Sequence, residues 1–268
     1  MREWWREFSG LVLPVSCAGC GRPRTELCPV CGAALSGAAP RRVRPSPRPA
    51  GLPEVYAAAP YENAVRAVLL AHKERGALGL ARPLGRALAA SVRAGTGRMG
   101  AVGPLLLVPV PSARSATAAR GHDPVRRIAR SAAYELRRAG CPARVLPVLR
   151  QCRTVVDQSG LGARGRRANL AGALEVAGGG ERLLAHGRVV LVDDLLTTGA
   201  TLAEAARAVA EAPGGPRGSS GRAVGFPGGA VCVAAVVSAS PSAFEINRNR
   251  PRTCVVAGNE RAKPPERR

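Results

Sequence analysis

The sequence predicts an α/β protein whose parallel sheet is flanked by helices, with a small cysteine-rich unit ahead of it. Two features carry this prediction. Between residues 54 and 238, short apolar runs alternate with segments whose apolar residues recur every three or four positions, which is typical of strands joined by crossover helices. Before them stand two Cys-x-x-Cys pairs, a spacing typical of a metal site.

The strands are expected where apolar runs rich in Val, Leu or Ala are bounded by turn residues. These runs are 55–59, 105–110, 145–149, 188–192 and 231–237. The first is expected at an edge of the sheet. The run 188–192 has four consecutive apolar residues before an acidic end, which predicts a strand buried on both faces near the centre of the sheet.

The helices are expected between these strands, where one side of each segment is apolar. They are 62–71, 80–92, 124–138 and 200–212. The third has a clear start, because Asp123 can cap the free N–H groups of a first turn and Pro124 suits the first helical position. A catalytic role for Asp123 is the alternative to this capping role.

The composition divides the chain into four parts. An N-terminal helix and the cysteine unit are expected over residues 1–35, and a Pro/Arg-rich linker over 36–53. The α/β domain extends over 54–238 and includes a flexible insertion rich in Gly, Pro and Ser at 213–229. A disordered basic tail is expected over 239–268.

The two cysteine pairs are Cys17 with Cys20 and Cys28 with Cys31, and a glycine follows each pair, as a tight turn around a metal requires. Four thiolates at this spacing can surround one tetrahedral Zn²⁺. Because all four ligands would be cysteine, no position is left for water or substrate, and the predicted role of the zinc is structural. Disulfides and free thiols are the alternatives, and disulfides require an oxidising compartment.

The formal net charge of the chain is +22. A charge of this size favours a polyanionic partner such as DNA. Codon bias in a GC-rich genome is the alternative, because arginine is abundant while lysine occurs only at Lys73 and Lys263. Aromatic residues make up 3% of the chain, which argues against a stacking platform for single-stranded nucleic acid.

No stretch of the sequence is apolar over the about 20 residues that span a bilayer. The apolar N-terminal segment is short, is interrupted by Gly10 and Pro14, and follows acidic residues, so it does not resemble a secretion signal. We therefore expect a cytoplasmic protein without a membrane span.

The most informative motif begins at the end of the central strand. Asp193 and Asp194 stand at its carboxyl end, where ligands bind in parallel α/β sheets, and two adjacent carboxylates are suited to the two neighbouring hydroxyls of a ribose. The residues that lead into the next helix supply hydroxyls and free N–H groups that can hold a phosphate. They are Thr197, Thr198, Gly199, Ala200 and Thr201. The alternative is a strand, turn and capped helix with acids at the turn.

A second loop leaves the strand predicted at 105–110 and carries Arg114 and Arg120. Arginine makes bidentate contacts to phosphate, so both residues are candidates for binding a pyrophosphate. The three histidines, His72, His122 and His186, are expected to be bystanders, with catalysis as the alternative.

Residues 193–201 resemble the phosphoribosyl-pyrophosphate (PRPP) signature of type I phosphoribosyltransferases. The order of motifs along the chain is similar to that of the ComF family, whose phosphoribosyltransferase-like domain follows an N-terminal zinc knuckle. In this chain the order is the cysteine pairs, a charged turn at Lys73–Gly76, Pro109-Val110-Pro111 with Arg120-Gly121, a segment from Gln158 to Asn169, and the 193–201 motif. The family has an aromatic residue, Asn and Gln after the Arg-Gly pair, where this chain has His122, Asp123 and Pro124.

The resemblance implies a type I phosphoribosyltransferase-like fold over residues 54–238. It implies that Asp193 and Asp194 are the catalytic acidic pair on the ribose, that the Thr197–Thr201 loop holds the 5′-phosphate, and that Mg²⁺ binds with PRPP. The expected activity is transfer of phosphoribosyl from PRPP, or a related sugar phosphate, to an unidentified acceptor.

The resemblance also implies a link to DNA uptake in competence, with DNA and a competence helicase as candidate partners. The alternative function is that of a catalytically silent protein. Such a protein would sense PRPP, or would serve as a DNA-uptake accessory that binds DNA or partner proteins.

Overall fold

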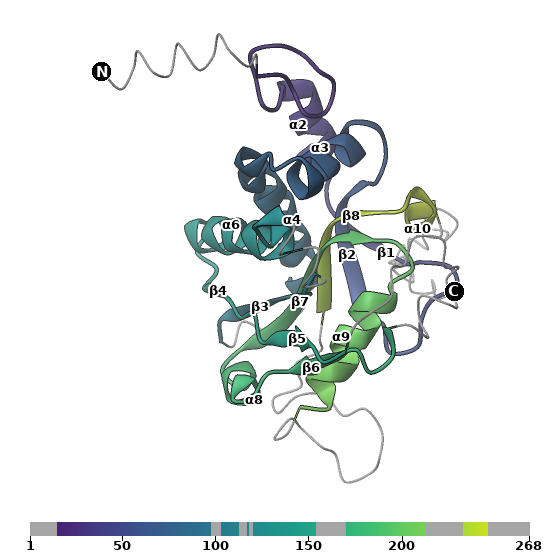
Figure 1. The fold of residues 1–268 in the computed structure, drawn as a ribbon, viewed down its shortest axis with the longest axis vertical. Coiled ribbons are helices and arrows are strands. Elements are labelled where there is room, and N and C mark those ends of the chain that lie inside the picture. The colour runs from purple at the N-terminus through teal and green to yellow at the C-terminus, as the bar shows by residue number, and fades with distance from the viewer. Residues whose placement is uncertain are drawn as a thin grey trace, which may run out of the picture.

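The computed structural model describes residues 15–97, 103–112, 117, 120–153, 170–212 and 233–245. At its centre is a six-stranded sheet in which β1 is antiparallel to β2 and all other neighbours are parallel (Figure 1). In spatial order its strands are β1 (Arg41–Val43), β2 (Glu54–Pro60), β8 (Val233–Ala239), β7 (Arg188–Leu196), β3 (Leu105–Pro109) and β4 (Ala143–Val145). The predicted α/β architecture with a mostly parallel sheet is therefore confirmed.

Strand β7 lies in the interior of this sheet, between β8 and β3. Its apolar run Val189–Val192 is buried throughout. Alternate residues of a strand face opposite sides of a sheet, and here Val190 and Val192 pack in one core while Val189 and Leu191 pack in the other. The prediction of a central strand buried on both faces is confirmed.

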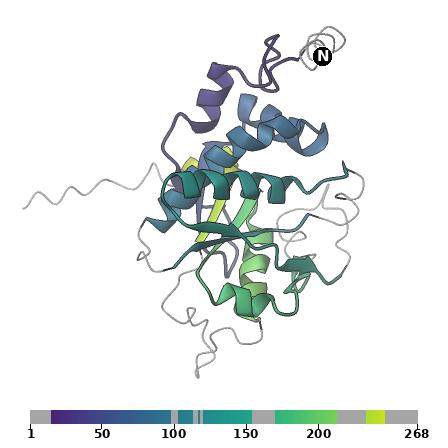
Figure 2. The ribbon, with the colours of Figure 1, turned by 90° about the vertical axis from the view of Figure 1, so that its left-hand side faces the viewer.

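Helices cover both faces of the sheet. One face carries α3 (Asn63–Glu74), α4 (Ala81–Thr96) and α6 (Pro124–Arg138), with α2 (Pro29–Ser36) and η1 (Leu78–Leu80) near one end. The other face carries α8 (Gly180–Leu184), α9 (Ala200–Ala210), α10 (Pro241–Glu245) and a two-stranded antiparallel sheet of β5 (Leu149–Gln151) and β6 (Leu174–Val176). Figure 2 shows α6 crossing in front of the sheet.

Helix α6 spans the predicted residues, 124–138. The carboxylate of Asp123 accepts a hydrogen bond from the backbone N–H of Arg126 at 3.0 Å, and Pro124 occupies the first helical position. Asp123 is therefore the helix cap, which was the first of its two predicted roles.

Helix α3 continues three residues past its predicted end, to Glu74. The turn predicted at 73–76 is therefore wrong for its first two residues, which form the last helical turn. The extension places Lys73 and Glu74 in the last turn of α3.

Two strand predictions are wrong. The run 145–149 is not one strand: β4 ends at Val145, and the chain then leaves the main sheet and begins β5 at Leu149, which pairs with β6. Strand β2 is not at an edge, because β1 pairs with its outer side. Strand β1 lies inside the segment predicted as a linker, where a high Pro and Arg content obscures three residues of strand.

Several predictions fall on residues that the structure does not describe. They are the helix expected before residue 15, the loop residue Arg114, the arginine-rich segment 154–169 and the insertion 213–229. The segment predicted as a disordered tail begins with the end of β8 and with α10, and its residues 246–268 lie outside the described part of the chain.

Candidate functional site

Strand β7 extends past its neighbour β3 at its carboxyl end. The last rung between them joins the N–H of Val110 to the carbonyl of Val192, with a nitrogen–oxygen distance of 2.9 Å. On its other side β7 stays paired with β8 up to Leu196. Among the described residues, the segment from Asp193 to Leu196 thus pairs with β8 and not with β3, at the sheet edge where ligands of parallel α/β folds bind.

The two carboxylates at this end lie in different environments. Asp194 is 5% exposed and belongs to the same side of β7 as Val190 and Val192, the side that α3 covers. Asp193 is half-buried, and its Oδ1 accepts the backbone N–H of Asp194 at 2.8 Å. Burial and the adjacent charge of Asp194 raise the pKa of Asp193 well above its ordinary value, against an opposing effect of Lys73.

Lys73 is the direct partner of the acidic pair. Its Nζ donates to Oδ2 of Asp194 at 3.1 Å, and the two side chains are 35% and 7% exposed respectively. The charge of Asp194 raises the pKa of Lys73 above its ordinary value, although burial works in the opposite direction. Asp194 is therefore a buried carboxylate whose charge is balanced by one cation from α3.

Glu74 makes the neighbouring connection from α3. Its two carboxylate oxygens accept from Nε and Nη2 of Arg120 at 3.0 and 3.1 Å, a bidentate pair. The side chain of Arg120 is 20% exposed, and its charge counteracts the raised pKa of Lys73, so the two cations lie near each other. The structure thus places Arg120, a predicted pyrophosphate ligand, at the same end of α3 as the partner of Asp194.

The turn after β7 packs closely against neighbouring side chains and leaves no room for a side chain at Gly199. Gly199 has a φ of 76° and is the cap residue of α9. A Cβ at this position would lie 2.9 Å from Cδ2 of Leu52 and 3.3 Å from Cγ of Pro45, so both the left-handed conformation and the space favour glycine. The first-turn N–H groups of α9 have no partner within the helix, as at every helix start.

The two threonines of this turn differ. Thr197 is exposed, whereas Thr198 is half-buried and its Oγ1 accepts the N–H of Ala200 at 3.4 Å. Thr201 lies in the first turn of α9. A helix start with free N–H groups and nearby hydroxyls can hold a phosphate or another anion.

Two histidines lie next in the chain to the residues that pair at the end of α3: His72 precedes Lys73, and His122 lies two residues after Arg120. His72 is 1% exposed and its Nδ1 is 3.2 Å from the carbonyl of Ala77, while Nδ1 of His122 is 3.0 Å from the carbonyl of Arg120. The two rings meet edge to face with centroids 6.1 Å apart. Burial lowers the pKa of His72, and the charges of His122 and Arg127 act in the same direction.

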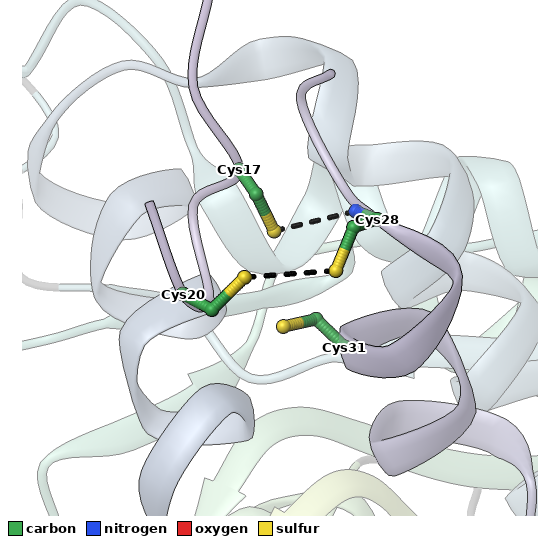
Figure 3. Close-up of side chains that lie close together, drawn as sticks. All are labelled: Cys17, Cys20, Cys28 and Cys31. Carbon is green, nitrogen blue, oxygen red and sulfur yellow. Dashed lines mark hydrogen bonds between the residues drawn. The ribbon is translucent and has the colours of Figure 1, made fainter. Parts of the chain in front are cut away.

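The cysteine cluster is the second candidate site, and Figure 3 shows its four side chains pointing toward one another. The sulfur atoms of Cys17, Cys20, Cys28 and Cys31 all lie within 4.8 Å of one another, and those of Cys20 and Cys28 are 3.6 Å apart. Sulfurs around a tetrahedral zinc would be about 3.8 Å apart, given a Zn–S bond of about 2.3 Å. A disulfide would need about 2.05 Å. These four cysteines could hold a metal such as zinc.

The surroundings of the cluster favour thiolates at some positions. Burial alone would raise the pKa of Cys17, but backbone N–H groups, that of Cys28 foremost, lower it to about 6. Cys28 donates this N–H to Sγ of Cys17 at 3.3 Å. Burial and the neighbouring thiols raise the pKa of Cys31 instead. A bound dication would compensate the accumulation of charge and let all four thiols ionise.

The chain matches no family model and no curated protein. In the described part of the chain, no helix is long and apolar enough to cross a membrane.

The sequence places Lys73 only in a charged turn and does not predict that it pairs with Asp194. Its contact with Asp194 joins positions 121 residues apart, which no local pattern reveals. One available signal was composition, because Lys73 is one of two lysines in a chain whose other basic residues, histidine aside, are arginines.

Proposed function

We propose that this protein is a ComF-family, type I phosphoribosyltransferase-like protein that binds PRPP, or a related sugar phosphate, at the carboxyl end of β7. One observation carries the proposal: an acidic pair, a short turn with a left-handed glycine and a helix start follow one another where β7 extends past β3. A sugar phosphate presents a phosphate and two neighbouring hydroxyls, which are the groups that this segment is suited to bind.

In this proposal each part of the segment has one task. Asp193 and Asp194 accept hydrogen bonds from the ribose hydroxyls, and the turn from Thr197 to Thr201 holds the 5′-phosphate. Arg120, with Arg114 of the same loop, binds the pyrophosphate. Mg²⁺ bound with PRPP would suit these hard oxygen donors and would neutralise phosphate charge.

The contacts of α3 add a step to this scheme. Asp194 is paired with Lys73, and Arg120 is paired with Glu74, so both ligand-binding groups have protein partners. Binding would exchange these partners: the ribose takes the carboxylate and the pyrophosphate takes the guanidinium. Lys73, once released, would remain beside the pyrophosphate as a fixed positive charge, which favours departure of an anionic leaving group.

The test is a calorimetric titration of PRPP and Mg²⁺ into the zinc-loaded protein. We expect saturable binding to the wild type and its loss in the Asp193→Asn/Asp194→Asn double variant. The matched control is Asp123→Asn, which removes one carboxylate from the neighbouring loop while keeping a good helix cap. A folded wild type that does not bind PRPP, or a double variant that binds as well as the wild type, would refute the proposal.

A second candidate function is that of a catalytically silent protein that senses PRPP or serves as a DNA-uptake accessory, with DNA and a competence helicase as partners. The salt bridges Lys73–Asp194 and Glu74–Arg120 favour it, because a ligand would have to displace both partners in order to bind. Release of pyrophosphate from PRPP in the presence of a mixture of acceptors separates the two functions. Turnover that is lost in the Asp193→Asn/Asp194→Asn variant supports the transferase, and stoichiometric binding without turnover supports the silent protein.

A further inference from the structure

A second cationic site lies away from β7, on the outer side of α4 and α6. It is a groove of about 460 Å³ between the start of α4, with η1 before it, and the exposed face of α6. Leu78 and Ala81 contribute apolar surface, and Arg82, Arg127, Arg130 and Tyr134 contribute the polar and aromatic groups. None of these residues belongs to the acidic pair, to the turn after β7 or to the cysteine cluster.

The helix geometry brings the three arginines together. Arg127, Arg130 and Tyr134 are spaced by three and four residues, so they share one face of α6. Gly85 of α4 is packed so tightly against Ser131 that a Cβ could not fit there. Gly85 lies about one turn after Arg82, and Ser131 follows Arg130. The close contact of the two helices therefore places Arg82 and Arg130 along the same groove.

These three arginines differ from those that have acidic partners. Salt bridges join other arginines to glutamates, as in Arg42–Glu54, Arg120–Glu74, Arg150–Glu175 and Arg207–Glu204. Among the residues that the structure describes, none of the three groove arginines makes a salt bridge or a hydrogen bond through its side chain. Glu26, whose carboxylate packs against Gly79 at the edge of the groove, does not bridge to them either.

The three arginines that line the groove carry like charges that repel one another, and a bound anion would reduce that repulsion. Guanidinium groups bind phosphate through paired hydrogen bonds. The groove also presents apolar surface that is unusual on an exposed face, because Tyr134 is 49% and Leu78 39% exposed. Arg138 lies 5.9 Å from the centre of the Tyr134 ring and helps to hold it in place.

We propose that this groove binds a small phosphorylated ligand with a planar or apolar group, of the size of a nucleotide. The phosphate would lie among Arg82, Arg127 and Arg130, and the planar group would pack on Tyr134 and Leu78. A volume of about 460 Å³ falls within the range of about 300–1,000 Å³ that is typical of small-ligand sites. The site is independent of the proposed PRPP site and does not require it.

The test uses AMP, ATP and inorganic phosphate as probes, titrated calorimetrically into the full-length zinc-loaded protein at fixed ionic strength. We expect saturable binding of AMP or ATP that the Arg127→Gln/Arg130→Gln variant weakens about tenfold or more, because the variant removes two charged donors of hydrogen bonds to the phosphate. Tyr134→Ala should weaken the binding of AMP but not the binding of inorganic phosphate. The matched control is Arg93→Gln, which removes an exposed charge from α4 outside the groove.

The background variant Asp193→Asn/Asp194→Asn should bind the nucleotide as the wild type does, which separates this site from the one at β7. The proposal is overturned if neither nucleotide binds saturably at millimolar concentration, or if Arg93→Gln weakens binding as much as the groove variants do. It is also overturned if only a DNA oligonucleotide binds and the groove variants abolish that binding. A thermal unfolding scan of each variant checks that these surface changes leave the fold intact.

Discussion

The pair formed by Lys73 and Asp194 is the contact whose removal tests the site most sharply. At a separation of 3.1 Å, two unit charges attract each other by about 5 kcal/mol if the effective dielectric constant is about 20. Desolvation and the partial exposure of Lys73 offset more than half of this energy. We therefore expect Lys73→Met, which keeps the apolar stem, to lower the free energy of unfolding by about 2 kcal/mol, because a buried carboxylate is left without its cation.

The assay is urea unfolding of four proteins: the wild type, Lys73→Met, Asp194→Asn and the double variant. The double variant should be more stable than the sum of the single effects predicts, with a coupling energy of about 1–2 kcal/mol. Lys73→Arg should retain part of the stability because it keeps the charge. A loss of less than about 0.5 kcal/mol in Lys73→Met, or strict additivity in the cycle, would show that Lys73 does not compensate the charge of Asp194.

Three further predictions concern the metal, a buried histidine and the turn after β7. Removing zinc with a chelator, or replacing Cys31 with serine, should lower the thermal midpoint by about 5 °C or more and abolish stoichiometric zinc in elemental analysis, and an unchanged midpoint would contradict a structural metal. Burial lowers the pKa of His72, so its contribution to stability is complete above about pH 6.5 and is lost as the pH falls through that value. A plot of the free energy of unfolding against pH should therefore have a shallower slope between pH 7 and 5 in His72→Gln, but not in the exposed control His186→Gln. Gly199→Ala should cost about 1–3 kcal/mol in chemical unfolding, since its φ is 76° and the added Cβ meets Leu52, whereas Gly178→Ala, with no atom within 4 Å of its Cβ, should be close to neutral; equal effects would remove the steric argument.

The elements that the sequence predicts well are those whose cause is local. Helix α6 follows from Asp123, Pro124 and a regular apolar stripe, and β7 follows from an uninterrupted apolar run. The cysteine cluster is equally local, because two Cys-x-x-Cys pairs a few residues apart can close on one point.

The features that the sequence does not reveal depend on distant partners. Strand β1 is three residues long in a Pro/Arg-rich segment, and only its pairing with β2 makes it a strand. The run 145–149 joins the end of β4 to the start of β5; Val145 packs in the core on one face of the main sheet, and Val148 and Leu149 pack in the core on the other face, so an apolar run that crosses between two sheets resembles one strand. The pairs Lys73–Asp194 and Glu74–Arg120 join residues 121 and 46 positions apart, and a single sequence carries no record of such contacts.

The two candidate sites differ in how much of each is local in the sequence. At the cysteine cluster, the sequence names all the ligands, and the structure adds distances. At β7, the sequence indicates the acidic pair, the turn and Arg120, but it does not show that Lys73 pairs with Asp194 or that Glu74 pairs with Arg120. Charge balance is a tertiary property, because it depends on which side chains share a region of low dielectric constant.

A crystal structure of the zinc-loaded protein with PRPP and Mg²⁺ would show directly whether β7 binds PRPP. We expect the 5′-phosphate at the start of α9 beside Thr197–Thr201, the ribose hydroxyls on Asp193 and Asp194, and Lys73 separated from Asp194. PRPP bound elsewhere, or bound at β7 with the Lys73–Asp194 pair intact and no contact to either carboxylate, would contradict this expectation.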